Sequence, residues 1–84
     1  MTAMAVSVPK RLFKKAVDRN LLKRRIREAY RLNKEILYAG LHSGQQNLTL
    51  IIQYQHEEIQ NFRTIEEATI KGLSRLAEQL KEQD

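Results

Sequence analysis

Hydrophobic side chains alternate with small or polar ones over residues 3–8, so that Met4, Val6 and Val8 share one side of an extended chain. A period of two with β-branched residues is typical of a β-strand. Pro9 lacks a backbone N–H and is expected to end this strand. The first predicted element is therefore a short strand with one hydrophobic side.

A helical period follows over residues 19–41. At about 100° per residue, seven apolar residues fall within one arc, namely Leu22, Ile26, Ala29, Tyr30, Ile36, Leu37 and Leu41. Asn33 is the polar residue inside that arc. Asp18 is the expected N-cap of this helix, and Gly40 with Gly44 marks its expected C-terminal end.

A second strand is predicted over residues 48–54, where Ile51 interrupts strict alternation and indicates partial burial on both faces. After a polar connection, Thr64 and Glu67 have the spacing of a capping box, which predicts the start of a last helix. Apolar residues then recur at helical spacing: Ile65, Ala68, Leu73, Leu76, Ala77 and Leu80.

The order β-α-β-α predicts an α+β fold, an α/β sandwich in which two parallel strands are joined by a crossover helix. Two strands alone leave both edges of the sheet unpaired and enclose little core. We therefore expect either more chain upstream or a second copy to complete the sheet, and a homodimer is one prediction.

The composition narrows the possible classes of protein. The chain has 84 residues, a net charge of +5 and no cysteine. That length indicates one domain over residues 1–84, and the missing cysteine excludes disulfides and thiolate metal sites. Because no long apolar run and no signal-peptide pattern is present, we expect a cytoplasmic protein that does not enter a membrane.

The charge is divided unevenly along the chain. The segment from Lys10 to Arg31 holds ten basic and two acidic residues, a net charge of +8, whereas the remainder carries −3. Such polarity favours a polyanionic partner, although a run of charge can also be a merely solvated face.

One arc of the first predicted helix gathers the polar residues Asn20, Lys23, Arg24, Arg27, Arg31 and Lys34. Its basic side chains from Lys23 to Arg31 form a ladder about 12 Å long, which suits contacts to successive phosphates. Asn20 could read a base edge or a ribose hydroxyl, or could simply belong to the first turn of the helix. The connector before the helix adds four further cations: Lys10, Arg11, Lys14 and Lys15.

Other candidate groups point to no chemistry of their own. Phe13 could stack on a base, but an apolar anchor for the connector is the alternative. His42 and His56 lack metal-ligand spacing and are expected on the surface. We find no nucleophile–base pair, phosphate loop or paired carboxylates, and so expect no catalytic residues and no metal ligands in the protein.

Three stretches resemble the bacterial ribonuclease P protein component. They are residues 7–11 (Ser-Val-Pro-Lys-Arg), 16–20 (Ala-Val-Asp-Arg-Asn) and 23–31 (Lys-Arg-Arg-Ile-Arg-Glu-Ala-Tyr-Arg). The family pattern is a strand ending in Ser-Val-x-Lys-Lys, a connector with Ala-Val-x-Arg-Asn, and a helix carrying Arg-Asn-Arg-x-x-Lys-Arg-x-x-Arg-Glu. The order and spacing agree over about 25 contiguous positions.

The resemblance implies a protein that binds a large catalytic RNA and assists removal of the 5′ leader from precursor tRNA. The RNA and its magnesium ions would carry out the reaction, and the isolated protein would not be catalytic. It also implies a left-handed crossover between the parallel strands, against the usual right-handed preference. The positions that match the RNA-facing signature are Lys10, Arg11, Arg19, Asn20, Lys23, Arg24 and Arg27.

Three departures from the family pattern are present. Leu21 replaces the second Arg of the Arg-Asn-Arg core, and Arg25 could partly compensate from a different angle. The connector, with Phe13 and Lys15, is about one residue longer than usual in the family. The helix and strands that normally come first in the family are missing, so we expect a partial domain with an incomplete cleft for the leader.

Two other interpretations remain open on the sequence alone. A generic basic RNA-binding module, such as a ribosome-associated protein, would bind structured RNAs without preference. An amphipathic helix on a membrane surface would also combine cations with an apolar stripe, although the strand pattern and Asn33 count against it.

Overall fold

The computed structural model describes residues 2–40 and 48–81. Along the chain, β1 (Thr2–Ser7) is followed by α1 (Ala16–Tyr38), β2 (Leu48–Gln53) and α2 (Phe62–Lys81). The predicted β-α-β-α order and α+β class are confirmed. Gly44, Leu41 and His42 lie outside the described residues.

β1 and β2 run parallel, with Met4 opposite Leu50 and Val6 opposite Ile52. These four side chains are half-buried. They pack against the hydrophobic clusters between the sheet and the helices. Each strand ends one residue earlier than predicted, although the residues beyond, Val8 and Tyr54, are buried and the Tyr54 N–H still donates to the Ser7 carbonyl at 2.9 Å.

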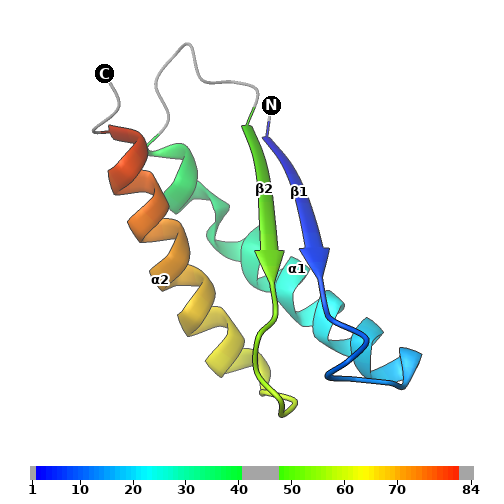
Figure 1. Ribbon diagram of the computed structural model, residues 1–84. Coiled ribbons are helices and arrows are strands. Elements are labelled where there is room, and N and C mark those ends of the chain that lie inside the picture. Colours follow the sequence, from blue (N-terminus) through cyan, green and yellow to red (C-terminus); the bar gives the residue numbers. More distant parts are fainter. Residues whose placement is uncertain (1, 41–47, 82–84) are drawn as a thin grey trace.

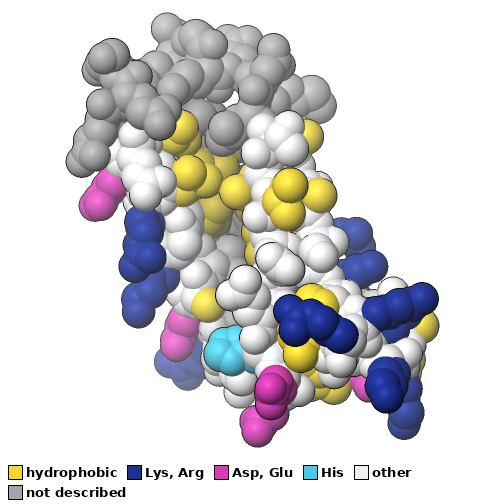
Figure 2. Space-filling view, in the orientation of Figure 1, with side chains coloured by type: hydrophobic (Ala, Val, Ile, Leu, Met, Phe, Trp, Pro, Cys, Tyr) yellow, Lys and Arg dark blue, Asp and Glu magenta, His cyan; other side chains and the backbone are white. Residues whose placement is uncertain are grey.

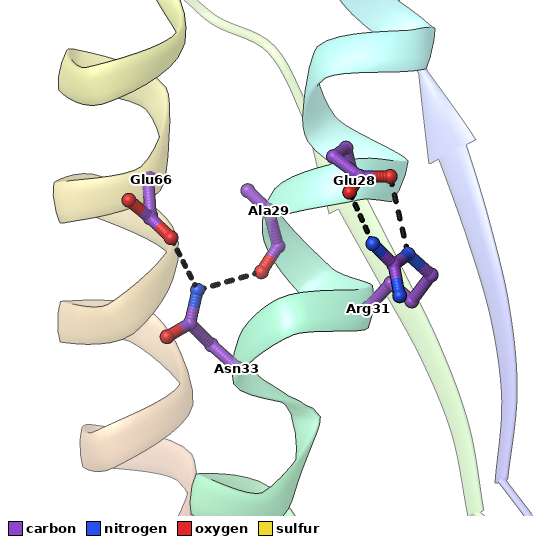
Figure 3. A network of polar contacts seen from close by, with 5 residues as sticks. All are labelled: Glu28, Ala29, Arg31, Asn33 and Glu66. Atoms are coloured by element: carbon purple, nitrogen blue, oxygen red, sulfur yellow. Dashed lines mark hydrogen bonds and ion pairs between the residues drawn. The ribbon is translucent and has the colours of Figure 1, made fainter.

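Both helices cover the same face of the sheet, in two layers (Figure 1). Seen from the helices with the strands pointing up, the chain passes through α1 from β1 on the right to β2 on the left (Figures 1 and 3). The crossover is therefore left-handed, the rarer hand for two parallel strands. This agrees with the expectation drawn from the family resemblance.

The core divides into two clusters along the groove between α1, α2 and the sheet. Around the connector end lie Val8, Phe13, Leu22, Ile26, Ala29, Tyr54 and Ile65. Around the other end lie Tyr30, Leu37, Leu73 and Leu80. The predicted apolar arc of α1 is thus the face that packs against the sheet and α2.

Gly40 follows α1 and shows why a residue without a side chain is needed there. A Cβ built on Gly40 would stand 2.6 Å from the Ala77 carbonyl oxygen on α2, which is too close for any side chain. Its backbone has no positive φ. The glycine therefore allows the end of α1 to approach α2 closely, and is not required by a left-handed turn.

The predicted N-terminus of α1 was three residues late. The helix begins at Ala16, with Lys15 as its N-cap, and the N–H groups of Asp18 and Arg19 both donate to the Lys15 carbonyl. Asp18 lies in the first turn and is not the N-cap. Its carboxylate is nevertheless favourable there, because it faces the positive end of the helix dipole.

The capping box predicted for α2 was also wrong. The helix begins at Phe62, and the Asn61 Oδ1 accepts a hydrogen bond from the Thr64 N–H at 2.8 Å. Asn61 therefore caps the helix, three residues before the predicted Thr64. Glu67 instead forms an exposed ion pair with Arg63 at 3.5 Å.

Candidate nucleic-acid interface

The arc of α1 that adjoins its buried residues carries Asn20, Lys23, Arg24, Arg27, Arg31 and Lys34, here called the basic face. Lys23 is half-buried and the other five side chains are exposed. Because Leu22, Ile26 and Ala29 anchor the adjoining side of the helix in the core, the basic face is held outward. It extends about 21 Å along the helix axis. The structure thus brings the helical part of the predicted site together.

The connector between β1 and α1 is a compact turn. The N–H groups of Leu12 and Phe13 both donate to the Pro9 carbonyl at 3.2 Å. Phe13 is buried and meets the Tyr54 ring edge-on, with 5.7 Å between ring centroids. It is therefore the anchor of the connector, and the alternative of an exposed stacking residue is wrong.

That anchoring leaves the cations of the connector on the outside. The exposed side chains are Lys10, Arg11, Lys14 and Lys15. Figure 2 shows Lys and Arg side chains gathered at this end of the molecule, where β1 leads toward α1. The amino-terminal end of α1 lies here as well, and the helix dipole adds positive potential.

Arg19, a predicted site residue, is half-buried and faces its own chain. Its Nη1 donates to the Phe13 carbonyl at 2.8 Å and to the Lys14 carbonyl at 2.9 Å. The guanidinium thereby fixes the connector against the first turn of α1. Arg19 thus sets the position of the connector cations relative to the basic face.

Arg25 lies about 100° around the helix from Arg24 and points away from the basic face. Its Nη1 donates to the Gln60 carbonyl at 2.6 Å. The Tyr54 hydroxyl holds the same connection, donating to the Glu58 carbonyl at 2.6 Å and accepting from the Gln60 N–H at 3.0 Å. Burial raises the pKa of Tyr54, which keeps this hydroxyl protonated as a donor.

Arg25 therefore secures the β2–α2 connection. It does not compensate for Leu21, which stands where the family pattern has an Arg, although the sequence had suggested this compensation. Leu21 is half-buried at the margin of α1.

Arg31 is engaged by an acid on its own helix, as Figure 3 shows. Its Nε donates to Glu28 Oε2 at 3.2 Å, and its Nη2 donates to Glu28 Oε1. This hydrogen bonding holds the pKa of Glu28 below its usual value and raises that of Arg31. The i,i+3 spacing in the sequence could have revealed this pair. Part of the charge of the basic face is thus offset at Arg31.

Asn33, the polar residue of the apolar arc, joins the two helices (Figure 3). Its Nδ2 donates to the Ala29 carbonyl at 2.8 Å and to Glu66 Oε2 on α2 at 3.0 Å. Asn33 is therefore a structural residue between α1 and α2, which explains its position in a hydrophobic pattern.

Among the described residues, the remaining candidate group is His56. His56 is exposed beside Tyr54, with 5.9 Å between ring centroids. Within residues 2–40 and 48–81, no group of three His, Asp or Glu side chains is placed to hold a metal ion. In the same part of the chain, neither helix is long and apolar enough to cross a membrane.

Comparison with known proteins shows to which family this chain belongs. The model of the family described as Ribonuclease P matches residues 2–77, which include every predicted site residue. The chain belongs to the ribonuclease P family. This match covers both strands, α1 and most of α2.

Two curated relatives are named Ribonuclease P protein component and come from Porphyromonas gingivalis strains ATCC 33277 and W83. Each is 45% identical over 76 residues, which cover 90% of this chain and 56% of the relative. The chain thus spans a little over half the length of these ribonuclease P proteins. No solved structure matches it significantly.

Proposed function

We propose that this chain is the protein subunit of ribonuclease P. In this role it binds the catalytic RNA and assists endonucleolytic removal of the 5′ leader from precursor tRNA in the cytoplasm. The protein contributes a surface for RNA, and the RNA supplies the reacting groups. Family membership and the geometry of the basic face support the proposal together.

The observation that carries the proposal is the set of outward cations on α1. Arg24 and Arg27 are exposed, and neither forms an ion pair with another described residue. Arg presents a planar fork of donors that fits phosphate oxygens. Each phosphate that such a side chain neutralises releases condensed counterions, which is the main source of affinity for RNA.

The connector enlarges this surface. Because Phe13 and Arg19 hold the turn in place, Lys10, Arg11, Lys14 and Lys15 are presented at the amino-terminal end of the basic face. The two groups of cations thus form one continuous positive region. A structured RNA with converging phosphate backbones is the partner that such a region fits.

Magnesium enters the proposal as an ion bound mainly by the partner RNA. The basic face of the described chain consists of cations and one amide, and repulsion by the cations disfavours a divalent metal there. Bound to the RNA, magnesium would supply Lewis-acid activation of the phosphodiester and of the attacking water. The protein residues would bind and orient the RNA and reduce repulsion between its phosphates.

Reconstituted cleavage tests the proposal. The chain, ribonuclease P RNA from Porphyromonas gingivalis and a precursor tRNA are combined at a magnesium concentration at which the RNA alone is nearly inactive. We expect the chain to increase cleavage, and a variant with Arg24→Ala and Arg27→Ala to lose most of that increase. No stimulation by a folded chain would contradict the proposal.

Two controls sharpen the result. A variant with Lys71→Ala and Arg75→Ala removes the same charge from exposed positions on α2 and should retain stimulation. Competition with an unrelated structured RNA distinguishes a general RNA-binding module: equal competition by that RNA would favour the general module over a ribonuclease P subunit.

A homodimer is the remaining proposed partner arrangement. Neither outer edge of the described two-stranded sheet pairs with another strand of residues 2–40 and 48–81. Unpaired edges favour association through strand pairing. Light scattering of the folded chain should give the mass of a dimer, and a monomeric mass at working concentration would contradict this arrangement.

A further inference from the structure

The surface formed by cations on α1 continues beyond Arg31, the last predicted contact. Lys34 is exposed, and Tyr38 follows one turn later with 41% of its surface exposed. At about 100° per residue, Tyr38 falls between Lys34 and Arg31 around the helix. It lies about 10 Å beyond Arg31 along the axis. An exposed aromatic ring thus ends the row of cations.

A second tyrosine of α1 lies in the core close to Tyr38. Tyr30, two turns earlier on α1, is buried and packs in one cluster with Leu37, Leu73 and Leu80. The Tyr30 hydroxyl is buried without a hydrogen-bond partner among the described residues. Burial raises the pKa of Tyr30, and the neighbouring Tyr38 hydroxyl raises it further. The two tyrosines are therefore neighbours, one in the core and one at the surface.

The charges around Tyr38 indicate which partner its ring suits. Two other exposed apolar residues of α1, Val17 and Leu32, lie on a different side of the helix, together with Glu28 and Glu35. Acidic neighbours oppose a polyanion. Tyr38 lies between Lys34 and Arg31 around the helix, and Glu35 is its one acidic neighbour, about 60° further around. Two cations against one acid favour a nucleic acid.

We propose that Tyr38 stacks on an unpaired base of the bound RNA while Lys34 contacts an adjacent phosphate. This inference rests on the proposed RNA-binding function and extends the interface to the carboxyl-terminal end of α1. Stacking accepts any base, because every base has a flat π-face. The pair would thus capture a single-stranded or bulged nucleotide next to the helical RNA that the basic face contacts.

The test measures affinity of the full chain for ribonuclease P RNA from Porphyromonas gingivalis at several salt concentrations. Tyr38→Leu should weaken binding at least about fivefold, since an aromatic ring is lost. Tyr38→Phe should remain within about twofold of the unchanged chain, because the ring persists. Leu32→Ala serves as the matched exposed control on α1 and should have no effect. Circular dichroism establishes that each variant is folded.

The salt dependence separates the two side chains. Tyr38→Leu should leave the slope of log K against log salt unchanged, whereas Lys34→Gln should reduce it by about one. Equal affinity of Tyr38→Leu and the unchanged chain would overturn the inference. An equal loss with Tyr38→Phe would also overturn it, because the hydroxyl would then be the contact.

The same measurements keep this inference distinct from the proposed function. If Arg24→Ala with Arg27→Ala weakens binding and Tyr38→Leu does not, the subunit role stands and the stacking contact fails. If the unchanged folded chain does not bind the RNA, both fail. A fully paired RNA duplex provides a further control, since its affinity should not respond to Tyr38→Leu.

Discussion

The two long helices both carry charged residues but arrange them differently. On α2, the exposed charges are of mixed sign along the helix: Arg63, Glu67, Lys71, Arg75, Glu78 and Lys81. On the basic face of α1, the charged residues are all positive, with Glu28 beside them. Mixed charge is typical of a solvated surface, whereas charge of one sign repels itself unless a partner neutralises it. The difference supports the proposal that RNA binds along α1.

The largest expected effect separates folding from RNA binding on α1. Leu22 is fully buried, so Leu22→Ala should lower the free energy of unfolding by about 2–5 kcal/mol. Half-buried Leu21 provides the neighbouring control, and Leu21→Ala should cost under about 1.5 kcal/mol. Urea denaturation measures both. Equal losses would mean that α1 does not bury the face described here.

A second prediction adds a cation to α1, the helix that carries the basic face. Leu21→Arg introduces the cation that the family pattern carries at this position. We expect RNA affinity to rise severalfold and the salt slope to steepen by about one. Fluorescence anisotropy with labelled ribonuclease P RNA measures both quantities. Glu78→Gln raises the net charge by the same amount by removing an anion from α2 and should change neither quantity, and a comparable gain there would mean that total charge alone determines binding.

The smallest expected effect concerns Glu28, the acidic residue of α1 that is paired with Arg31. Glu28→Gln releases Arg31 from its ion pair, so RNA affinity should rise by no more than about threefold. The variant should also lose a small pH dependence of stability. Because the folded pKa of Glu28 is lowered, its contribution is present above its ordinary value of 4.5 and disappears as the pH falls through the folded value.

Thermal unfolding at pH 7 and pH 3 measures that pH dependence. The melting temperatures of the unchanged chain and of Glu28→Gln should differ slightly at pH 7 and converge at pH 3. A difference that grows toward pH 3 would have the wrong sign for a lowered pKa.

Periodicity was sufficient to predict where the strands lie and the two sides of α1, because burial of Leu22, Ile26 and Leu37 is a repeated, local signal. The predicted partial burial of both faces of the second strand was wrong, because Ile51 is 68% exposed. The start of each helix was less predictable. Lys15 caps α1 without a side-chain hydrogen bond and Asn61 caps α2 through its Oδ1, whereas Asp18 and Thr64 merely have suitable residue types. The capping preference of a residue type is therefore not enough to predict the first residue of a helix, because the packing of the preceding turn also decides it.

Within the site, exposure of the cations was predictable but their individual partners were not. Arg19 and Arg25 resemble their neighbours in sequence, yet both donate to main-chain carbonyls, and the Gln60 carbonyl that Arg25 contacts lies far along the chain. Gly40 is likewise explained by its close approach to Ala77 on α2. Such contacts depend on the packed fold and leave no periodic pattern in the sequence.

The most direct measurement compares the salt dependence of RNA binding for two charge-matched variants. We expect Arg24→Ala with Arg27→Ala to reduce the slope of log K against log salt by about two, and to weaken binding at every salt concentration. Lys71→Ala with Arg75→Ala should leave both the slope and the affinity nearly unchanged. Equal slopes and equal affinities for the two variants would contradict the assignment of RNA to the basic face of α1.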